Sequence, residues 1–384
     1  MLGGDKLSEQ LKDIYTLDFL LEFSRKIKSV YPDFQTEQFI ASIMDETWEG
    51  LSLKARIRRI SQKLGDYLPN RYEAALEVLF SITDDCTGFP YLVFPDFVAV
   101  YGREEKHWEL SMKALERFTQ KSSSEFAIRP FLLQNPERVM KHMMCWARHS
   151  SEHVRRFASE GCRPRLPWGE ALPMFKKDPT PVLSVLELLK EDPSIYVRKS
   201  VANNLNDIAK DHAPLVLETA RRWAGRNTGT DWIIRHGCRT LIRKADSDAM
   251  ELFGYAKEDL LTTHASIVVQ PLELTIGDSC ELQYAVDIRQ GGPVHIRIEY
   301  GIEFVKAKGR ISRKLFLLSD KTVPGGAHLI GNRLHSWSDL TTRRHYPGDH
   351  RLILLVNGQE VARTVIELQV LQNDREQRDQ VNEG

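Results

Sequence analysis

The chain has 384 residues, and its 53 Lys and Arg balance 53 Asp and Glu, so its formal net charge at pH 7 is zero. This length suits two domains, and the charge balance excludes a uniformly basic, histone-like protein while leaving room for local basic surfaces. No run of 18 apolar residues predicts a membrane span, and the charged N-terminus lacks the apolar core of a signal peptide. We expect a cytoplasmic protein.

The cysteines show neither Cys-x-x-Cys spacing nor His/Cys metal-ligand spacing. They predict reduced thiols, with neither a disulfide framework nor a zinc site. They are Cys86, Cys145, Cys162, Cys238 and Cys280.

Residues 1–260 predict an all-α domain. Apolar residues recur at intervals of three and four, as in Leu11, Ile14 and the following Phe19, Leu20 and Phe23. Proline and glycine interrupt this pattern at short intervals, which indicates turns between many helices.

A repeat appears within this domain. Arg155, Arg198 and Arg235 each follow a β-branched residue, and they are separated by 43 and 37 residues. These separations are typical of HEAT-like helix pairs, which stack into a curved solenoid with a concave binding surface. The alternative is an irregular helical domain in which the dipeptides recur by chance.

Residues 261–373 alternate between apolar and polar side chains, with turn residues between the runs. Asn357-Gly358 between two such runs predicts a β-hairpin. Six or seven short strands in this length favour an immunoglobulin-like β-sandwich. The expected fold is therefore an α + β two-domain protein, in which a HEAT-like repeat solenoid precedes an all-β sandwich and a polar tail at 374–384.

Basic residues concentrate in two zones, one in each predicted domain. Residues 128–168 carry eight Lys and Arg against three acids, and residues 306–351 carry ten against three. Two basic zones fit a duplex that is held from both sides. The alternative is two solvated faces neutralised by acids from elsewhere. No P-loop or Rossmann motif appears, so no nucleotide cofactor is expected.

Acidic residues within such a surface repel phosphate and need another explanation. A carboxylate stabilises the oxocarbenium-like transition state of N-glycosidic hydrolysis and orients the attacking water. An alkylated base that is already cationic leaves without a general acid. The candidates are Glu125, Glu160 and Asp207. The alternatives are a capping box from Ser122 to Glu125, and helix capping or salt bridges of Glu160 and Asp207 with Arg155, Arg198 or Arg163.

Other polar and aromatic residues stand beside these acids. Trp168, at the tip of a proline-rich loop, is suited to stack on a base or sugar, although a core tryptophan fits the pattern equally. Asn203 and Asn204 are unusual inside a helix and are suited to bind phosphate or hold a carboxylate. His153 and His236 have no partner at metal-ligand spacing, so no metal site is expected.

Three blocks resemble the AlkC-type DNA alkylation-repair glycosylases, which are related to the AlkD-type HEAT-like repeat glycosylases. The blocks are SEFAIRPFL (124–132), VRRFASEGCRPRLPW (154–168) and YVRKSVANNLNDIAKDHAPLVLETARRW (196–223). The resemblance covers roughly residues 5–255, includes FPDFVAVYG (94–102), and extends to members with a C-terminal immunoglobulin-like domain.

The resemblance implies hydrolysis of the N-glycosidic bond of cationic alkylated bases in duplex DNA, without base flipping and without a cofactor. The bases are N3-methyladenine and also N3-methylcytosine or N1-methyladenine. Glu125, Glu160 and Asp207 match the acidic positions of the family, and Trp168 matches its aromatic position. The residues assigned to DNA binding are Arg155, Arg156, Arg163, Arg165, Trp168, Arg198, Asn203 and Asn204. No lysine stands where a Schiff-base nucleophile would, so a monofunctional glycosylase is expected. We also expect a monomer in the bacterial cytoplasm or nucleoid.

Two other functions remain open from the sequence. The first is a non-catalytic nucleic-acid-binding or scaffold protein on the same HEAT-like frame, and the second is a protein that binds structured RNA. Release of a base from methylated DNA distinguishes the enzyme from both.

Overall fold

The computed structural model describes residues 11–256, 261–340 and 343–370. The chain divides into two compact units, Met1–Cys238 and Arg239–Gly384. The predicted polar tail, 374–384, lies outside the described residues. None of the described helices is both long enough and apolar enough to cross a membrane.

The first unit is built from helices joined by short turns. Its N-terminal helices are α2 (Leu17–Val30), α3 (Thr36–Ile43), α4 (Leu53–Tyr67), α5 (Tyr72–Ile82), α6 (Val93–Tyr101), α7 (Trp108–Phe118), α8 (Arg129–Gln134) and α9 (Pro136–Trp146). The following helices are α10 (Glu152–Gly161), α11 (Pro173–Lys177), α12 (Thr180–Leu189), α13 (Ile195–Ile208), α14 (Ala213–Trp223) and α15 (Thr228–Gly237). Short 3-10 turns are η1 (Trp48–Gly50), η2 (Thr83–Asp85), η3 (Phe89–Leu92) and η4 (Glu105–His107).

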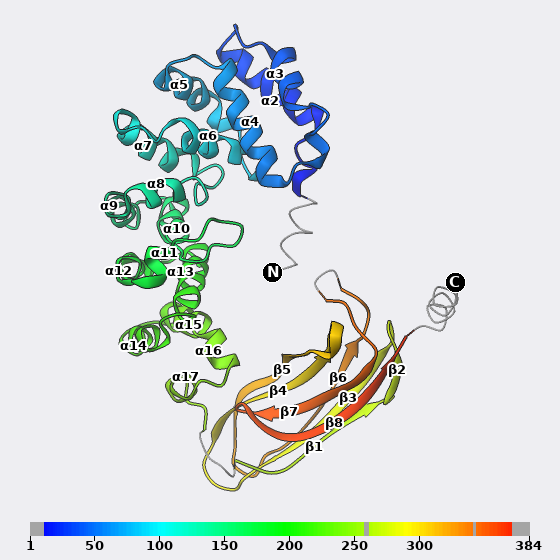
Figure 1. The fold of residues 1–384 in the computed structure, drawn as a ribbon. Coiled ribbons are helices and arrows are strands. Elements are labelled where there is room, and N and C mark those ends of the chain that lie inside the picture. The colour runs from blue at the N-terminus through cyan, green and yellow to red at the C-terminus, as the bar shows by residue number, and fades with distance from the viewer. Residues whose placement is uncertain (1–10, 257–260, 341–342, 371–384) are drawn as a thin grey trace, which may run out of the picture. The chain divides into compact units, whose positions relative to one another are not determined.

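The helices from α8 onward form the predicted HEAT-like stack. In Figure 1, α9, α12 and α14 form one row, and α10, α13 and α15 form a second row beside it. Helix α13 packs between α10 and α15 in the second row. The apolar residues that mark the repeat, Val154, Val197 and Ile234, are all buried between the rows.

Arg155 and Arg198 make the same contacts in successive repeats. Arg155 Nη1 donates to the carbonyls of His149 and Ser150 at 3.0 and 2.7 Å. Arg198 Nη1 donates to the carbonyls of Asp192 and Pro193 at 2.9 and 2.8 Å. Each arginine thus binds carbonyls in the loop before its own helix, so the repeated dipeptide stabilises the turn between repeats.

The second unit begins with α16 (Arg239–Arg243) and α17 (Ser247–Leu252) and continues as an immunoglobulin-like β-sandwich. One sheet has the order β1-β3-β6 and the other β2-β8-β7-β4-β5. The strands are β1 (Thr262–Gln270), β2 (Glu273–Thr275), β3 (Ser279–Ile288), β4 (Val294–Val305), β5 (Ile311–Val323), β6 (His328–Ser336), β7 (Gly348–Val356) and β8 (Gln359–Gln369), with η5 (Ala307–Gly309) between β4 and β5.

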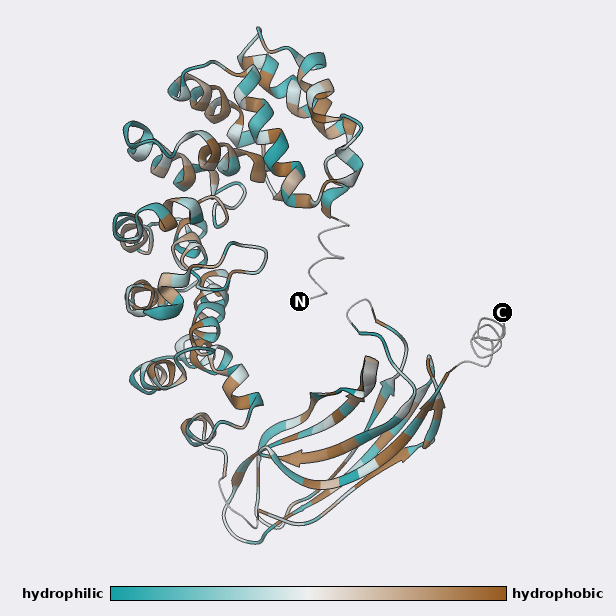
Figure 2. Cartoon of the chain, in the orientation of Figure 1, coloured by the Kyte–Doolittle hydropathy of each residue, from teal (hydrophilic) through white to brown (hydrophobic). Residues whose placement is uncertain are grey.

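Alternating side chains of both sheets fill the sandwich core. The side chains of Ile298, Ile302 and Trp337 are fully enclosed there. Strand β7 is apolar along most of its length, as Figure 2 shows by its brown colour, because it lies in the interior of its sheet between β4 and β8. The predicted Asn-Gly hairpin joins β7 to β8, and both turn residues have positive φ, 49° at Asn357 and 84° at Gly358, as a type I′ turn requires.

Candidate active site

The candidate site lies where α10 packs against α13. Helix α13 begins at the N-cap Ser194, whose hydroxyl accepts a hydrogen bond from the Tyr196 amide at 3.2 Å. Ser200, Asn204 and Asp207 follow at intervals of four and three, so they share one face of the helix. This face meets the C-terminal end of α10 and brings Asp207 close to Glu160 and Arg163.

Glu125 is held by an arginine of α10. Arg156 Nη1 donates to Glu125 Oε2 at 2.6 Å and to Ser123 Oγ at 2.9 Å. The same guanidinium lies 3.7 Å from Glu160 Oε1. The capping box expected from Ser122 to Glu125 does not form, because the next helix, α8, begins only at Arg129 and has no side-chain cap. Glu125 therefore lies in a turn, where its carboxylate reaches across to α10.

Arg163 joins the other two acids. Its Nη1 donates to Glu160 Oε1 at 2.5 Å, and its Nε donates to Asp207 Oδ2 at 2.9 Å. Ser200 donates to Glu160 Oε2 at 2.5 Å, and Lys210 donates to Asp207 Oδ1 at 2.9 Å. Together with the Arg156 pair, these contacts form a chain of alternating charges, here called the carboxylate network: Glu125, Arg156, Glu160, Arg163, Asp207 and Lys210.

Most of the network is buried. The side chains of Glu125, Glu160 and Asp207 are 10%, 8% and 4% exposed. Burial alone lowers the pKa of Arg156, but the carboxylates of Glu125 and Glu160 outweigh it, so that its pKa is raised. The pKa of Arg163 is likewise raised, because Glu160 and Asp207 outweigh its burial. The arginines therefore stay charged and fix the positions of the carboxylates.

Arg129 stabilises the network by binding main-chain carbonyls at the end of α10 and in the loop that follows it. Its side chain is buried, and its Nη1 and Nη2 donate to the carbonyls of Gly161 and Arg163 at 3.2 and 3.0 Å. Burial lowers its pKa to about 10. Its Nε donates to the Glu170 carbonyl as well, so one guanidinium holds the end of α10 and the loop that follows it.

Trp168 lies in that loop with an unusual backbone. Its φ is 61°, a left-handed conformation that a bulky residue adopts only when its surroundings impose it. Lys54 donates to the Trp168 carbonyl, and the Gly169 amide donates to the Leu166 carbonyl at 3.0 Å. The loop is thus held in one shape, and the tryptophan is neither a fully buried core residue nor fully exposed.

The structure brings together some of the site residues that the sequence predicted, but not all of them. Arg165 forms an ion pair with Asp211 at 2.6 Å, and Arg155 with Asp192 at 2.6 Å, and neither acid belongs to the carboxylate network. Asn203 is half-buried. Asn204 has no exposed surface, and its amide donates to the Ser159 carbonyl at 2.8 Å. This burial contradicts its assignment to a DNA-contacting surface, since its amide ties α10 to α13 instead.

The basic zone at 128–168 is largely neutralised by ion pairs with acids of the helical unit. Arg138 pairs with Glu105 and Glu109 at 2.7 and 3.0 Å, in addition to the pairs of Arg155, Arg156, Arg163 and Arg165 described above. The charge count along the sequence therefore overstates the free positive charge of this surface.

Several residues of the site were not predicted from the sequence. Ser200 and Tyr196 lie four residues apart on the α13 face that carries Asp207, a helical spacing that was visible in the sequence. Tyr196 is 40% exposed, and the Arg156 guanidinium lies 5.1 Å from the centre of its ring. Arg129 gave no sequence signal, because its partners are main-chain carbonyls more than 30 residues away.

Within the described residues, no group of three or more His, Cys, Asp or Glu side chains is arranged to hold a metal ion. The site itself presents carboxylates held in place by arginines. A carboxylate that is fixed before the substrate arrives stabilises a positive charge without reorganisation.

The chain is similar to known proteins in both of its units. Residues 263–370 match a family model described as the uncharacterised protein YhaZ, C-terminal Ig-like domain. An uncharacterised protein YhaZ from Bacillus subtilis (strain 168) is 44% identical over 349 residues, covering 91% of this chain and 96% of the relative.

A solved structure matches nearly the whole chain. It is the Pseudomonas fluorescens alkylpurine DNA glycosylase AlkC bound to DNA containing an abasic site analog, with a TM-score of 0.89 and 37% identity. The match covers 94% of this chain and 99% of the solved chain. A HEAT-like stack followed by an immunoglobulin-like sandwich, matched at this identity and coverage, leaves one assignment: the chain belongs to the family of YhaZ and the AlkC-type DNA glycosylases.

Proposed function

We propose that the protein is a monofunctional DNA glycosylase that removes cationic alkylated bases from duplex DNA. The substrates are N3-methyladenine and also N3-methylcytosine or N1-methyladenine. The observation that carries the proposal is the carboxylate network, in which Glu125, Glu160 and Asp207 are fixed by arginines. The family membership supports it, since the AlkC relative binds DNA with an abasic site analog.

The proposed reaction breaks the bond between C1′ of the sugar and the ring nitrogen of the base. The electron pair of that bond neutralises the cationic base, which leaves without protonation. Positive charge then develops on the sugar, and a water adds its oxygen to C1′ while a carboxylate accepts its proton. A base that need not be protonated need not enter an enclosed acidic pocket, which supports cleavage without base flipping.

The three acids differ in their hydrogen-bond partners. Glu160 has one oxygen on Arg163 and the other on Ser200, and Asp207 lies between Arg163 and Lys210. Glu125 accepts two hydrogen bonds from Arg156. We assign all three to stabilise the sugar cation and orient water, Arg156 and Arg163 to hold the carboxylates, and Trp168 and the partly exposed Arg165 to hold the DNA.

The test uses the full chain and duplex DNA that has been treated with a methylating agent. We expect free N3-methyladenine, measured by mass spectrometry, to appear faster than in the same DNA without protein. Base release at the spontaneous rate would overturn the proposal.

A second function follows from the same contacts. Because each of the three carboxylates is paired with an arginine, the network also fits a non-catalytic DNA-binding or scaffold protein, whose ion pairs only hold the repeats together. This alternative predicts salt-dependent duplex binding without base release.

A further inference from the structure

A cleft of about 340 Å³ opens beside the carboxylate network. This volume is in the range of small-molecule sites, roughly 300–1,000 Å³. The cleft lies between the start of α4, the η3–α6 segment, the turn that leads into α8, and the loop of Trp168. None of the proposed catalytic carboxylates lines it.

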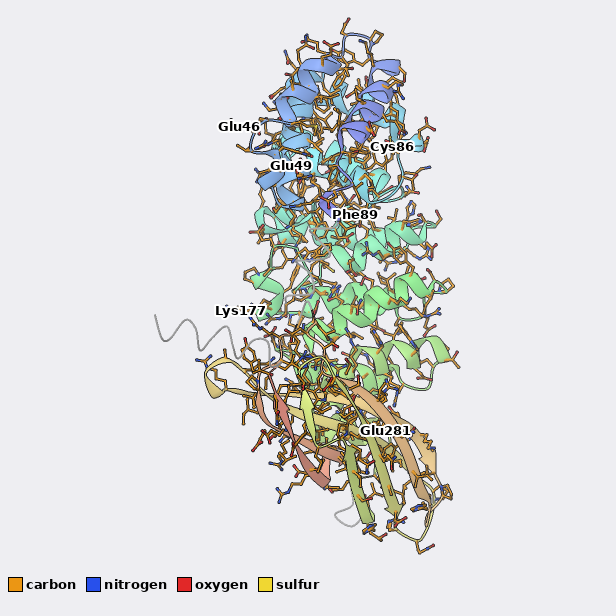
Figure 3. All side chains as sticks on the ribbon, turned by 90° about the vertical axis from the view of Figure 1, so that its right-hand side faces the viewer. Glu46, Glu49, Cys86, Phe89, Lys177 and Glu281 are labelled. Carbon is orange, nitrogen blue, oxygen red and sulfur yellow. The ribbon has the colours of Figure 1, made fainter. Side chains whose placement is uncertain are left out.

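Three aromatic residues contribute to its walls. Phe89, Phe126 and Trp168 come from separate segments, and each is only partly buried. Figure 3 labels Phe89, which lies about midway along the helical unit. Partly exposed rings that converge on one cleft are the usual platform for an unstacked base, because every base has a face on which an aromatic ring can stack.

The cleft also holds two cations that form no ion pair among the described residues, Arg129 and Lys54. Arg58 is bound through two hydrogen bonds to Asp96, at 2.9 and 2.8 Å, and Arg129 donates to main-chain carbonyls. Lys54 donates to the Trp168 carbonyl and lies 5.5 Å from the centre of the Phe126 ring. Among the described residues it forms no ion pair, and an ammonium group has three donors. Lys54 is thus available to an anionic group of a ligand.

The cleft is connected to the carboxylate network by two of its lining residues. Ser123 accepts a hydrogen bond from Arg156 at 2.9 Å, and Arg129 holds the carbonyls of Gly161 and Arg163. A ligand in the cleft would therefore contact Ser123 and Arg129, which bind directly to Arg156 and to the main chain of Arg163.

We propose that this cleft binds an unstacked nucleotide, with its base on the Phe126 ring and its phosphate on Lys54. The inference rests on the proposed function only in naming DNA as the source of that nucleotide. The charges of the cleft favour this ligand over a free cationic base, since Lys54, Arg58 and Arg129 outnumber Asp96 and Glu170. The site would hold a nucleotide that leaves the stack near the lesion, apart from the sugar on which the acids act.

The test measures equilibrium binding to the full-length protein at low salt. The probes are dAMP, adenine without a phosphate, deoxyribose 5-phosphate without a base, and a short single-stranded oligonucleotide. The variants are Phe126→Ala and Lys54→Gln. Their controls are Phe80→Ala, which removes a partly buried ring outside the cleft, and Lys113→Gln, which removes an exposed lysine on α7. Thermal melting checks that each variant is folded.

We expect Phe126→Ala to weaken binding of dAMP roughly 10-fold, the loss of one base–ring stacking contact. Lys54→Gln should weaken dAMP binding and leave adenine binding unchanged, which distinguishes loss of a phosphate contact from a disturbed Trp168 loop. A parallel loss for the oligonucleotide identifies DNA as the source, and a loss for dAMP alone identifies free nucleotides. Failure of the wild-type protein to bind dAMP or the oligonucleotide saturably, or equal binding by Phe126→Ala and Phe80→Ala, would overturn the inference.

These outcomes are independent of base release. Binding that depends on Phe126, in a protein that releases no base, would support the cleft and remove the proposed activity. Base release by a protein whose nucleotide binding does not depend on Phe126 would support the proposed activity and remove the nucleotide site in the cleft.

Discussion

The proposed catalytic acids are also structural ion-pair partners. Glu160 and Asp207 share Arg163, the salt bridge that was the competing explanation of both residues in the sequence. The two explanations are compatible, because an arginine that holds a carboxylate in place also prepares it for a developing positive charge. The sequence pattern could not distinguish a catalytic role from a structural ion pair, because both require the same residue types at the same positions.

Arg163 should matter more to stability than any other arginine of its loop. Arg163→Gln leaves Glu160 without one of its partners and Asp207 with Lys210 alone. Because both carboxylates are almost fully buried, we expect a loss of about 3–5 kcal/mol in the free energy of unfolding. Arg165→Gln is the matched control, because it removes a partly exposed pair with Asp211 and should cost at most about 1 kcal/mol. Urea unfolding followed by circular dichroism measures both. Equal losses would contradict the buried network.

At the scale of elements, helix spacing predicted much of the site. The three-and-four periodicity predicted α10 and α13, and the recurring Val-Arg dipeptide predicted that they occupy equivalent repeats. Their contact through Ser200 and Asn204 was not predictable, because it depends on how two helices 40 residues apart are rotated about their axes. The same rotation buries Asn204, which the sequence analysis placed on a binding surface.

The hairpin of the sandwich was predicted from two residues, and its turn gives a test. Gly358 has a φ of 84°, and a Cβ added there would lie 2.1 Å from the Cβ of Ala245. Gly358→Ala should therefore destabilise the second unit by roughly 1–3 kcal/mol, from backbone strain and from displacement of the segment between α16 and α17.

The control for this variant is Gly292→Ala. Gly292 lies in another loop of the same unit, where an added Cβ meets nothing within 4 Å. Thermal unfolding of the full chain should show a lower melting temperature for Gly358→Ala than for Gly292→Ala. Identical melting temperatures would show that the turn does not require glycine.

At the scale of the whole molecule, the periodicity of apolar residues predicted the two architectures, but the sequence did not predict the charge of their surfaces. The change from helical to alternating periodicity after residue 260 is visible without a structure, and the sandwich was predicted from it. Pairing of Arg138, Arg155 and Arg165 with acids that are distant in the sequence is a tertiary property. Counts of charge along a sequence cannot reveal it.

The sandwich core should make the molecule sensitive to acid. Burial, followed by the nearby Arg343 and His345, lowers the pKa of His335 to about 4 from an ordinary value of 6.5. The neutral folded form is therefore favoured, and the unfolded chain binds the proton first as the pH falls. This contribution to stability is complete above pH 6.5 and is lost between pH 6.5 and 4, by about 3 kcal/mol. Burial lowers the pKa of His345 and His350 in the same direction.

Thermal melts of the full chain at pH 7.5, 6.0 and 5.0 (roughly spanning this window) measure the effect. We expect the melting temperature of the second unit to fall with pH, and His335→Gln to reduce that slope. His264→Gln, which changes an exposed histidine of β1, should leave it unchanged. A melting temperature that is constant over this range would contradict a buried neutral His335.

The most direct test of the central claim is the rate of base release under single-turnover conditions. Saturating protein is mixed with a duplex that carries one N3-methyladenine, and the free base is measured over time for the wild type, Glu160→Gln and Asp207→Asn. Glu37→Gln, an exposed acid on α3, serves as control. We expect each network variant to slow release roughly 10²- to 10³-fold, as loss of one preorganised electrostatic group does, with duplex affinity retained. Wild-type rates in both network variants would contradict a catalytic role for the carboxylates.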